Sequence, residues 1–369
     1  MPKERALLAS VSAKGRKSAA EASLLELAEL ADTAGAEAVG QIIQELKNPS
    51  RTTYMGSGKL SEIRQQISDL GANLVIIDEE LTPLQQRNIE QSLEVKIIDR
   101  SALILDIFAQ RAQTSEGRLQ VELAQHQYLL PRLAGQWQHL ERLGGGIGTR
   151  GPGEKQIETD RRILRTQIHR LKKRNEAVRK HRQLYRDRRR KMGVPVVALI
   201  GYTSAGKSTL LNSLCSSDVL ADKKLFSTLD PTTRRLHIPE NNQVLLTDTV
   251  GFIRKLPPAV INAFHATLEE LADASVLVHV VNMAATDAET QCRTVENILK
   301  DMDIFEIPRI TVINKIDLLL DKEKSWDEAT AVKYLEQHGQ KPAPDTVLVS
   351  AIQRWGLGKL RELIAKKLI

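Results

Sequence analysis

The feature that most constrains the fold of this chain is an eight-residue stretch with the pattern G-x-x-x-x-G-K-[ST]. It reads Gly201, Tyr202, Thr203, Ser204, Ala205, Gly206, Lys207 and Ser208. An apolar run at 194–200 precedes it and a helix-like run at 208–214 follows it, which is the context of a phosphate-binding loop. Backbone N–H groups and the helix N-terminus of such a loop surround a phosphate, Lys207 reaches the outer phosphates and the Ser208 hydroxyl binds Mg²⁺. The stretch therefore predicts a nucleoside triphosphate site in an α/β domain.

Two further motifs follow apolar, strand-like runs downstream of the loop. The first, Asp248-x-x-Gly251, places a carboxylate that can hold Mg²⁺ through water and an N–H group that can sense the γ-phosphate. The second is Asn314-Lys315-Ile316-Asp317, in which the Asp317 carboxylate can accept both the N1–H and the exocyclic amine of guanine. Adenine offers neither donor in that geometry, so the pair of motifs predicts a guanine nucleotide. A last strand-like run ends at Ser350-Ala351, where the Ala351 N–H is expected to donate to guanine O6.

The segment 225–234, between the loop and Asp248, is expected to be a switch. A hydroxyl is needed there to complete Mg²⁺ coordination when the γ-phosphate is present, so the segment would order in one state and loosen in the other. The residues alone leave Thr228, Thr232 and Thr233 open, and a polar surface loop without a role is the alternative.

Position 252 bears on the rate of hydrolysis. Many small GTPases carry a glutamine there that orients the attacking water, and this chain carries Phe252. We therefore expect slow hydrolysis by the protein alone, with a partner or another residue ordering the water.

Length and composition set the frame for these motifs. A chain of 369 residues predicts two or three domains, and 41% hydrophobic with 27% charged residues is typical of a globular protein. Cys215 and Cys292 fit neither a metal site nor a disulfide framework, which favours a reducing compartment. We find neither a signal peptide nor a run long enough to span a membrane, so the expected location is the cytoplasm.

The positive charge is concentrated in one segment. The formal net charge is +7, yet residues 161–191 hold 15 Lys/Arg against two acids, a net +13. The remaining 38 basic and 44 acidic residues give −6. Such a run can be a solvated helix face, but it favours a nucleic-acid partner.

The same segment carries a helical pattern. Ile157, Leu164, Leu171, Val178 and Tyr185 recur every seven residues, which predicts a basic helix over 154–191 as one arm of an antiparallel hairpin. The other arm would span 116–143, with a kink near Pro131 and Gly135. The tip at 143–154 is glycine-rich, and it reads either as a flexible linker or as a probe for RNA.

The first 110 or so residues alternate strand-like and helix-like pieces. Strands are expected at 6–11, 38–44, 73–77 and 95–98, and helices at 19–33, 60–70, 83–93 and 100–111. This rhythm predicts a small parallel sheet covered by helices. Gly56-Ser57-Gly58-Lys59 lacks the first glycine and the preceding strand of a phosphate loop, so we reject it as a second nucleotide site.

Motifs across nearly the whole chain resemble those of the HflX family of translational GTPases. They are Tyr54–Lys59, Ile98–Phe108, Gly144–Arg161, Gly201–Ser208, Leu225–Arg234 and Asp248–Phe252. The resemblance implies that the switch threonine is Thr228 and that Ser208 and Thr228 bind Mg²⁺. Lys207, Thr228 and Gly251 would be the catalytic residues. Beyond the loop 201–208, the implied nucleotide contacts are Phe226, Ser227, Thr228, Leu229, Asp230, Asp248, Thr249, Val250, Gly251, Asn314, Lys315, Ile316, Asp317, Ser350, Ala351 and Ile352.

The resemblance also implies three domains and a partner. They are an N-terminal α/β domain (1–112), a helical hairpin linker (113–192) and a P-loop GTPase domain (193–369). A C-terminal domain that some members carry is expected to be absent, because 18 residues follow Ala351. The implied partner is the large ribosomal subunit with its rRNA, and the implied role is to split or rescue stalled or idle ribosomes under stress. We expect the chain itself to be a monomer. A large-subunit assembly factor, or a non-ribosomal GTP switch whose basic hairpin meets a protein or membrane, are the alternatives.

Overall fold

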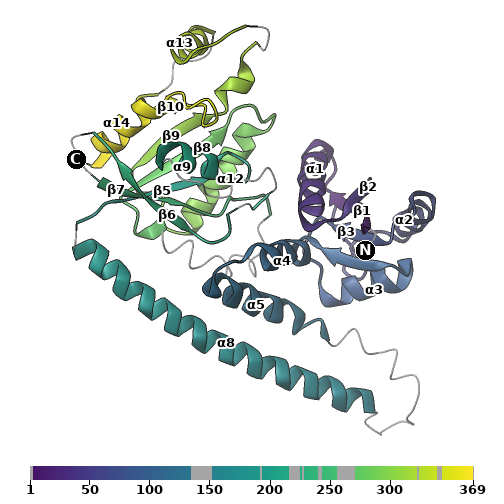
Figure 1. The fold of residues 1–369 in the computed structure, drawn as a ribbon. Coiled ribbons are helices and arrows are strands. Elements are labelled where there is room, and N and C mark those ends of the chain that lie inside the picture. Colours follow the sequence, from purple (N-terminus) through teal and green to yellow (C-terminus); the bar gives the residue numbers. More distant parts are fainter. Residues whose placement is uncertain are drawn as a thin grey trace. The chain divides into compact units, whose positions relative to one another are not determined.

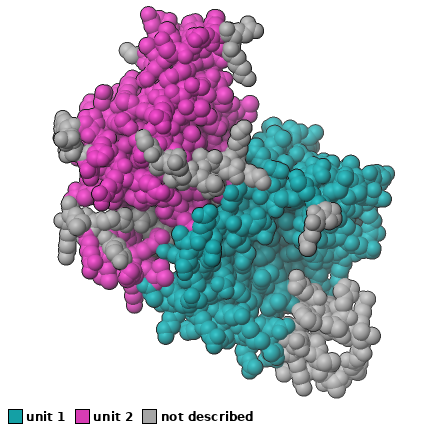
Figure 2. All heavy atoms as spheres, viewed as in Figure 1, with its two compact units in different colours: residues 1–177, 255–263 teal, residues 178–254, 264–369 magenta. Residues whose placement is uncertain are grey.

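The computed structural model describes residues 3–133, 152–191, 193–215, 225–226, 228–239, 243–255, 271–321, 324–338 and 343–368. The chain divides into two compact units (Figure 2). Unit 1 comprises Met1–Ala177 with Lys255–Ala263, and unit 2 comprises Val178–Arg254 with Phe264–Ile369. None of the helices in the described residues has both the length and the hydrophobicity that a membrane span requires.

Unit 1 begins with a four-stranded sheet whose strands alternate with helices (Figure 1). The elements are β1 (Arg5–Ser12), α1 (Lys17–Ala34), β2 (Glu37–Glu45), α2 (Ser57–Leu70), β3 (Leu74–Ile77), α3 (Pro83–Leu93), β4 (Lys96–Asp99) and α4 (Arg100–Arg111). The strand order is β2-β1-β3-β4, and all three pairings are parallel. The predicted parallel α/β sheet is confirmed, since every predicted element overlaps an observed one with small shifts at the ends.

The two faces of this sheet are both buried. Leu7 of β1 packs with Val75 of β3, Leu60 of α2 and Ile89 of α3 in one hydrophobic cluster. Leu8, which points to the opposite face because side chains alternate along a strand, is equally inaccessible. Burial on both faces explains why the central strands β1 and β3 read as apolar runs.

The segment Tyr54–Lys59 leads into a helix. Met55 is fully buried in the core of unit 1, and Gly56 is the N-cap of α2. Lys59 lies in the first turn of α2, where its Nζ pairs with Glu62 at 2.6 Å. Lys59 thus pairs with a carboxylate of its own helix, whereas Lys207 donates to backbone carbonyls of its loop.

Two further helices follow the first sheet: α5 (Ser115–Leu129) and α8 (Pro152–Lys191). In Figure 1, α5 and the first part of α8 run in opposite directions. The predicted basic helix over 154–191 is confirmed, with Ile168 and Leu171 buried on its inner side. The other arm was predicted over 116–143 with a kink near Pro131 and Gly135. The first of these is confirmed: α5 ends at Leu129 and residues 130–132 form a turn, because Pro131 lacks the N–H that a continuing helix needs. Gly135 and most of the glycine-rich tip lie outside the described residues.

Unit 2 contains a six-stranded sheet. Its elements are β5 (Val196–Gly201), α9 (Lys207–Cys215), β6 (Thr232–His237), β7 (Gln243–Asp248), β8 (Val276–Asn282), α12 (Ala288–Asp301), β9 (Arg309–Asn314), the 3-10 helix η1 (Ile316–Leu319), α13 (Glu328–His338), β10 (Thr346–Leu348) and α14 (Leu357–Leu368). The strand order is β10-β9-β8-β5-β7-β6, and β6 alone pairs antiparallel within this sheet.

Strand β6 was not predicted from the sequence. The segment 225–234 was predicted to be a switch, and its last residues Thr232, Thr233 and Arg234 belong to β6 and pair with β7. Within β6 only Leu236 is buried, so an edge strand of this kind shows almost no apolar pattern.

Helices cover both faces of the second sheet and leave one edge for the motifs. Leu210 of α9 and Leu360 of α14 pack on one face, whereas Val295 of α12 packs on the other. The carboxyl ends of β5, β7 and β9 meet at the same edge, where open α/β sheets bind their ligands. The phosphate loop, the Asp248 and Asn314 motifs and Ser350-Ala351 follow strands that end there, whereas the switch segment 225–234 leads into β6.

Candidate functional site

The phosphate loop connects β5 to α9, and two glycines make its path possible. Gly201 has φ +147° and Gly206 has φ +95°, and a Cβ on Gly201 would lie 2.3 Å from the carbonyl oxygen of Val280. The Nζ of Lys207 donates to the carbonyl oxygens of Gly201 at 3.2 Å and Tyr202 at 3.0 Å, so the loop wraps around an ammonium group.

The environment of that ammonium favours an anion. Burial lowers the pKa of Lys207 to about 8, and the carboxylate of Asp248 opposes the shift only in part. A phosphate group placed beside Lys207 would stabilise its charged form. The loop therefore holds a desolvated cation at the position where the outer phosphates of a nucleotide are expected.

Three oxygen-bearing side chains converge beside the loop. The Ser208 hydroxyl lies 2.6 Å from Oδ2 of Asp248, the Thr228 hydroxyl lies 2.8 Å from the same oxygen, and the two hydroxyls are 2.8 Å apart. Burial raises the pKa of Asp248, while Lys207 and the two hydroxyls oppose the shift. Its second oxygen, Oδ1, is buried and has no hydrogen-bond partner among the described residues. Hydroxyls and a partly unsatisfied carboxylate are ligands that suit a hard divalent cation.

The geometry separates the three candidate threonines of the switch. Only Thr228 reaches Ser208, whereas the Thr233 hydroxyl lies 2.9 Å from that of Thr247 on the neighbouring strand. Thr232 lies in the same strand, opposite Asp248. Of the other expected contacts near Thr228, Phe226 and Leu229 are buried, Asp230 is half-buried and Ser227 lies outside the described residues.

Gly251 and Phe252 lie against the phosphate loop. The N–H of Phe252 donates to the Gly201 carbonyl at 3.1 Å, and the N–H of Thr203 donates to the Phe252 carbonyl at 2.8 Å. A Cβ on Gly251 would lie 2.7 Å from the Cα of Thr203 and 3.0 Å from the Nζ of Lys207. Only glycine fits this close approach. The remaining residues of the motif, Thr249 and Val250, are buried.

The side chain of Phe252 packs away from the loop. It lies in a hydrophobic cluster with Ile200, Leu271 and Val295 and is 4% exposed. The Phe252 side chain has no group that could hydrogen-bond a water, and because its ring faces the core it also lies away from the loop. Sequence reasoning missed one contact here: the N–H of Arg254 donates to the Tyr202 hydroxyl at 2.9 Å. No pattern in the sequence signals it.

The base-reading motif joins the phosphate loop through Asn314. Its Nδ2 donates to the Ala205 carbonyl at 2.8 Å, and its Oδ1 accepts from the Ala351 N–H at 3.1 Å. The Ala351 N–H was expected to donate to guanine O6, and in this structure it donates to Asn314. The Ser350 hydroxyl donates to Oδ1 of Asp317 at 2.6 Å, which orients the carboxylate.

The flanking residues complete this side of the site. Lys315 adopts φ +64°, and Ile316 after it is fully buried. Ile352, the last of the expected contacts, is 71% exposed. The four motifs of the GTPase domain thus come together at one edge of the sheet of unit 2.

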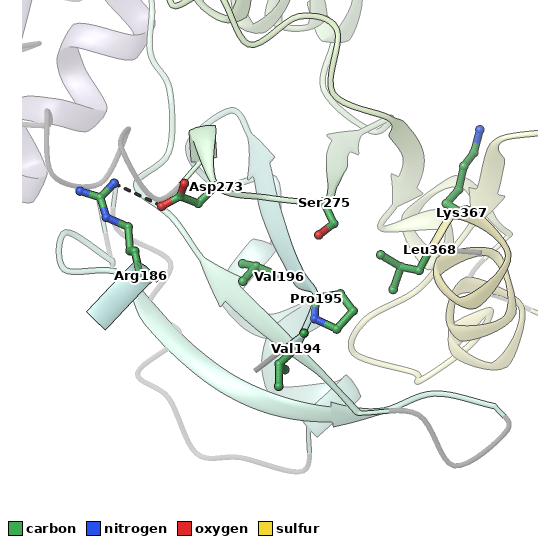
Figure 3. Close-up of a pocket in the computed structure, with 9 residues that line it drawn as sticks. Arg186, Val194, Pro195, Val196, Asp273, Ser275, Lys367 and Leu368 are labelled. Atoms are coloured by element: carbon green, nitrogen blue, oxygen red, sulfur yellow. Dashed lines mark hydrogen bonds and ion pairs between the residues drawn. The ribbon is translucent and has the colours of Figure 1, made fainter. Parts of the chain in front are cut away.

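A described pocket of about 350 Å³ lies elsewhere in unit 2, at the amino ends of β5 and β8 (Figure 3). Figure 3 shows Arg186 near the end of α8 reaching Asp273, and the two are 3.3 Å apart. The apolar part of the lining is Val194, Pro195, Val196 and Leu368. The nucleotide motifs end at the opposite edge of the sheet, so this pocket takes no part in the site.

Comparison with known proteins gives three consecutive family matches. Residues 21–109 match the model described as GTP-binding GTPase N-terminal, and residues 111–189 match GTP-binding GTPase Middle Region. Residues 196–315 match the model described as 50S ribosome-binding GTPase. In the solved structures, SsGBP in complex with GDP matches 98% of both chains at a TM-score of 0.51 and 24% identity, which shows a shared fold.

Curated relatives match over most of the chain. A GTPase HflX of Caldanaerobacter subterraneus subsp. tengcongensis is 51% identical over 317 residues, which are 86% of this chain and 73% of the relative. A GTPase HflX of Escherichia coli is 44% identical over 345 residues, which are 94% and 79%. The assembled GTPase motifs agree with these matches, and this GTP-binding, GTP-hydrolysing chain belongs to the HflX family of GTPases.

Proposed function

We propose that the chain is a Mg²⁺-dependent GTPase whose GTP-bound form binds the large ribosomal subunit and whose hydrolysis step ends that binding. The observation that carries the ribosomal part is the charge of α8, and the description of the family model matching 196–315 supports it. The nucleotide part rests on the converging side chains of unit 2.

The residues present fit a magnesium ion. Ser208 and Thr228 would be its protein ligands, with Asp248 beside them, because their oxygens already converge and Oδ1 of Asp248 has no other partner among the described residues. When bound, the ion neutralises charge that develops on the phosphoryl group during transfer. Lys207 and the backbone N–H groups of 204–208 would surround the phosphates, and Asp317 would select guanine.

The two segments around the site give the chain a nucleotide-dependent signal. Thr228 belongs to one segment and Gly251 to the other, and both lie at the phosphate loop. A γ-phosphate contacted from both sides would hold both segments in place, and its loss would release them. We therefore expect tight ribosome binding with a non-hydrolysable GTP analogue and weak binding with GDP.

The exposed side of α8 is the proposed contact for rRNA. Its exposed basic residues are Arg162, Arg165, Arg170, Lys172, Lys173, Arg174, Arg179, Lys180 and Arg188. Neutralisation of rRNA phosphates releases counterions, so affinity that depends on this side should fall steeply with added salt.

Co-sedimentation with purified large subunits tests the proposal. Arg162, Lys173 and Lys180 are exposed and are spaced by whole numbers of helical turns, so the variant R162E/K173E/K180E reverses one face of α8. We expect this variant to lose binding to the large subunit, and we expect its remaining affinity to depend less on the salt concentration. The control K333E/K359E/K366E reverses the same number of exposed basic residues in unit 2, outside α8. Equal binding by both variants and the unmodified chain would refute the role of α8.

The consequence of binding is tested separately. We propose that the chain separates subunits of stalled or idle ribosomes, so GTP-bound protein should convert intact ribosomes to free subunits in a density gradient. Accumulation of precursor large subunits after depletion, without subunit separation, would favour an assembly role. Binding to anionic vesicles with indifference to ribosomes would place the basic helix at a membrane instead.

A further inference from the structure

One buried hydroxyl group of the phosphate loop, that of Thr203, takes no part in the contacts of the nucleotide site. Thr203 is 6% exposed, and its Oγ1 is buried with no hydrogen-bond partner among the described residues. A buried hydroxyl without a partner is costly, since its desolvation is not compensated. Such a group needs either a structural reason or a ligand that the protein alone does not contain.

The position of Thr203 points to the γ-phosphate. Its Cα and Cγ2 each lie 2.7 Å from the place that a Cβ on Gly251 would occupy, and the Nζ of Lys207 lies 3.0 Å from that same place. Gly251 and Lys207 are the two groups expected to contact the γ-phosphate. Thr203 therefore lies with both of them, its methyl group toward Gly251, at the end of the loop where the γ-phosphate is expected.

Three neighbouring hydroxyl groups are already engaged, and the Ser204 side chain is exposed. Those of Ser208 and Thr228 bind Asp248, and that of Tyr202 accepts from the Arg254 N–H. The ring of Phe252, at the position where other GTPases orient water, is packed in the core. Of these side chains, Thr203 is the one that combines burial, position and an unused hydroxyl.

We propose that Thr203 is a catalytic residue whose hydroxyl accepts a hydrogen bond from the attacking water. The water oxygen forms a bond to the γ-phosphorus, and the bond from that phosphorus to the oxygen of the GDP leaving group breaks. The leaving oxygen keeps the electron pair, and the proton of the water passes to a phosphate oxygen. Thr203 takes no proton, and it orients the water lone pair toward phosphorus.

Single-turnover hydrolysis by the full chain alone tests this role without ribosomes. Thr203→Val keeps the shape and removes the hydroxyl, whereas Thr203→Ser keeps the hydroxyl and removes the methyl group. We expect Thr203→Val to lower the rate constant at least about tenfold and Thr203→Ser to stay within about threefold of the unmodified chain. Affinities for GDP and for a non-hydrolysable GTP analogue should stay unchanged in both.

The controls separate catalysis from packing. Thr294→Val removes a hydroxyl that bonds only within α12 and should leave the rate unchanged. Hydrolysis at the unmodified rate by Thr203→Val overturns the proposal. Equal losses in the Val and Ser variants, or a parallel loss of GDP affinity, also overturn it, because the methyl group or the loop shape would then be responsible. If Thr203→Val is unstable in a thermal melt, Thr203→Ala provides the same comparison.

Discussion

The hydroxyl oxygen of Thr228 lies 2.8 Å from a carboxylate oxygen of Asp248, although the two residues are 20 positions apart in the sequence. Ser208 contacts the same oxygen from a third segment. The phosphate loop, the switch and the strand end of β7 therefore share one polar contact in unit 2. A divalent cation at this point would hold three separate segments of the chain together.

Removal of the Thr228 hydroxyl tests that arrangement. We expect Thr228→Val to lower GTP hydrolysis by about 100-fold and to weaken a GTP analogue more than GDP, because the hydroxyl is needed when the γ-phosphate and Mg²⁺ are both present. In a Mg²⁺ titration, the variant should need a higher Mg²⁺ concentration to reach half of its maximal hydrolysis rate. Thr233→Val, whose hydroxyl bonds Thr247 on the neighbouring strand, is the matched control. Equal losses in both variants would contradict the assignment.

Base selection is expected to depend on Asp317, which the Ser350 hydroxyl orients at 2.6 Å. Asp317→Asn places an amide donor opposite the exocyclic amine of guanine, so we expect GDP affinity to fall by about 100-fold or more. Xanthine carries a carbonyl where guanine carries that amine, so XDP should bind the variant better than GDP does. Calorimetric titration with GDP and XDP measures this change in base preference. Asp301→Asn at the end of α12 is the control. Retained preference for GDP would refute the role of Asp317.

The close packing of the phosphate loop gives a stability prediction. A Cβ at Gly201 would lie 2.3 Å from the Val280 carbonyl, so Gly201→Ala should destabilise unit 2 by about 3 kcal/mol and abolish nucleotide binding. Gly358 in α14 has nothing within 4 Å of its would-be Cβ, so Gly358→Ala should stabilise by a few tenths to about 1 kcal/mol. Scanning calorimetry of both variants measures whether their stabilities change in opposite directions. Equal melting temperatures would contradict the strand–loop geometry.

The buried His279 of β8 predicts a pH dependence of stability. Burial lowers its pKa to about 4 from 6.5, with repulsion from Arg309 and Lys207 in the same direction. Between these values the unfolded chain binds a proton that the folded chain does not. The free energy of unfolding should therefore fall as the pH falls from 6.5 to about 4, by up to about 3 kcal/mol.

Thermal melts across this pH window measure the effect. His279→Leu should show a flatter dependence than the unmodified chain, whatever its stability at neutral pH. The control His338→Gln, on the exposed end of α13, should keep the original slope. Parallel curves for His279→Leu and the unmodified chain would show that this histidine does not contribute.

Much of the fold could be predicted because its strands are buried on both faces. The runs around Val75, Val197 and Val278 are apolar without interruption, and the loop at Gly201 follows one of them directly. Edge strand β6 was missed because only Leu236 of its residues is buried. The end of α5 at Leu129 could be predicted, because Pro131 lacks the N–H group that a continuing helix needs.

In the candidate site, too, some features follow from the sequence and others do not. Gly201, Lys207 and Asp317 have side chains or conformations that their motifs demand, so spacing along the chain was enough to find them. The contacts of Tyr202 and Thr203 depend on how the segment after Gly251 lies against the loop. Such contacts between segments far apart in the sequence leave no periodic pattern.

Multiple-turnover GTP hydrolysis, measured with and without purified large ribosomal subunits at near-physiological salt, tests most directly whether the ribosome controls this enzyme. The ring of Phe252 is packed in the core, so we expect slow turnover by the protein alone and strong stimulation by the subunits. The R162E/K173E/K180E variant should lose the stimulation and keep the basal rate. Fast turnover by the protein alone, or no stimulation despite normal GTP binding, would contradict the proposal that the ribosome controls this enzyme.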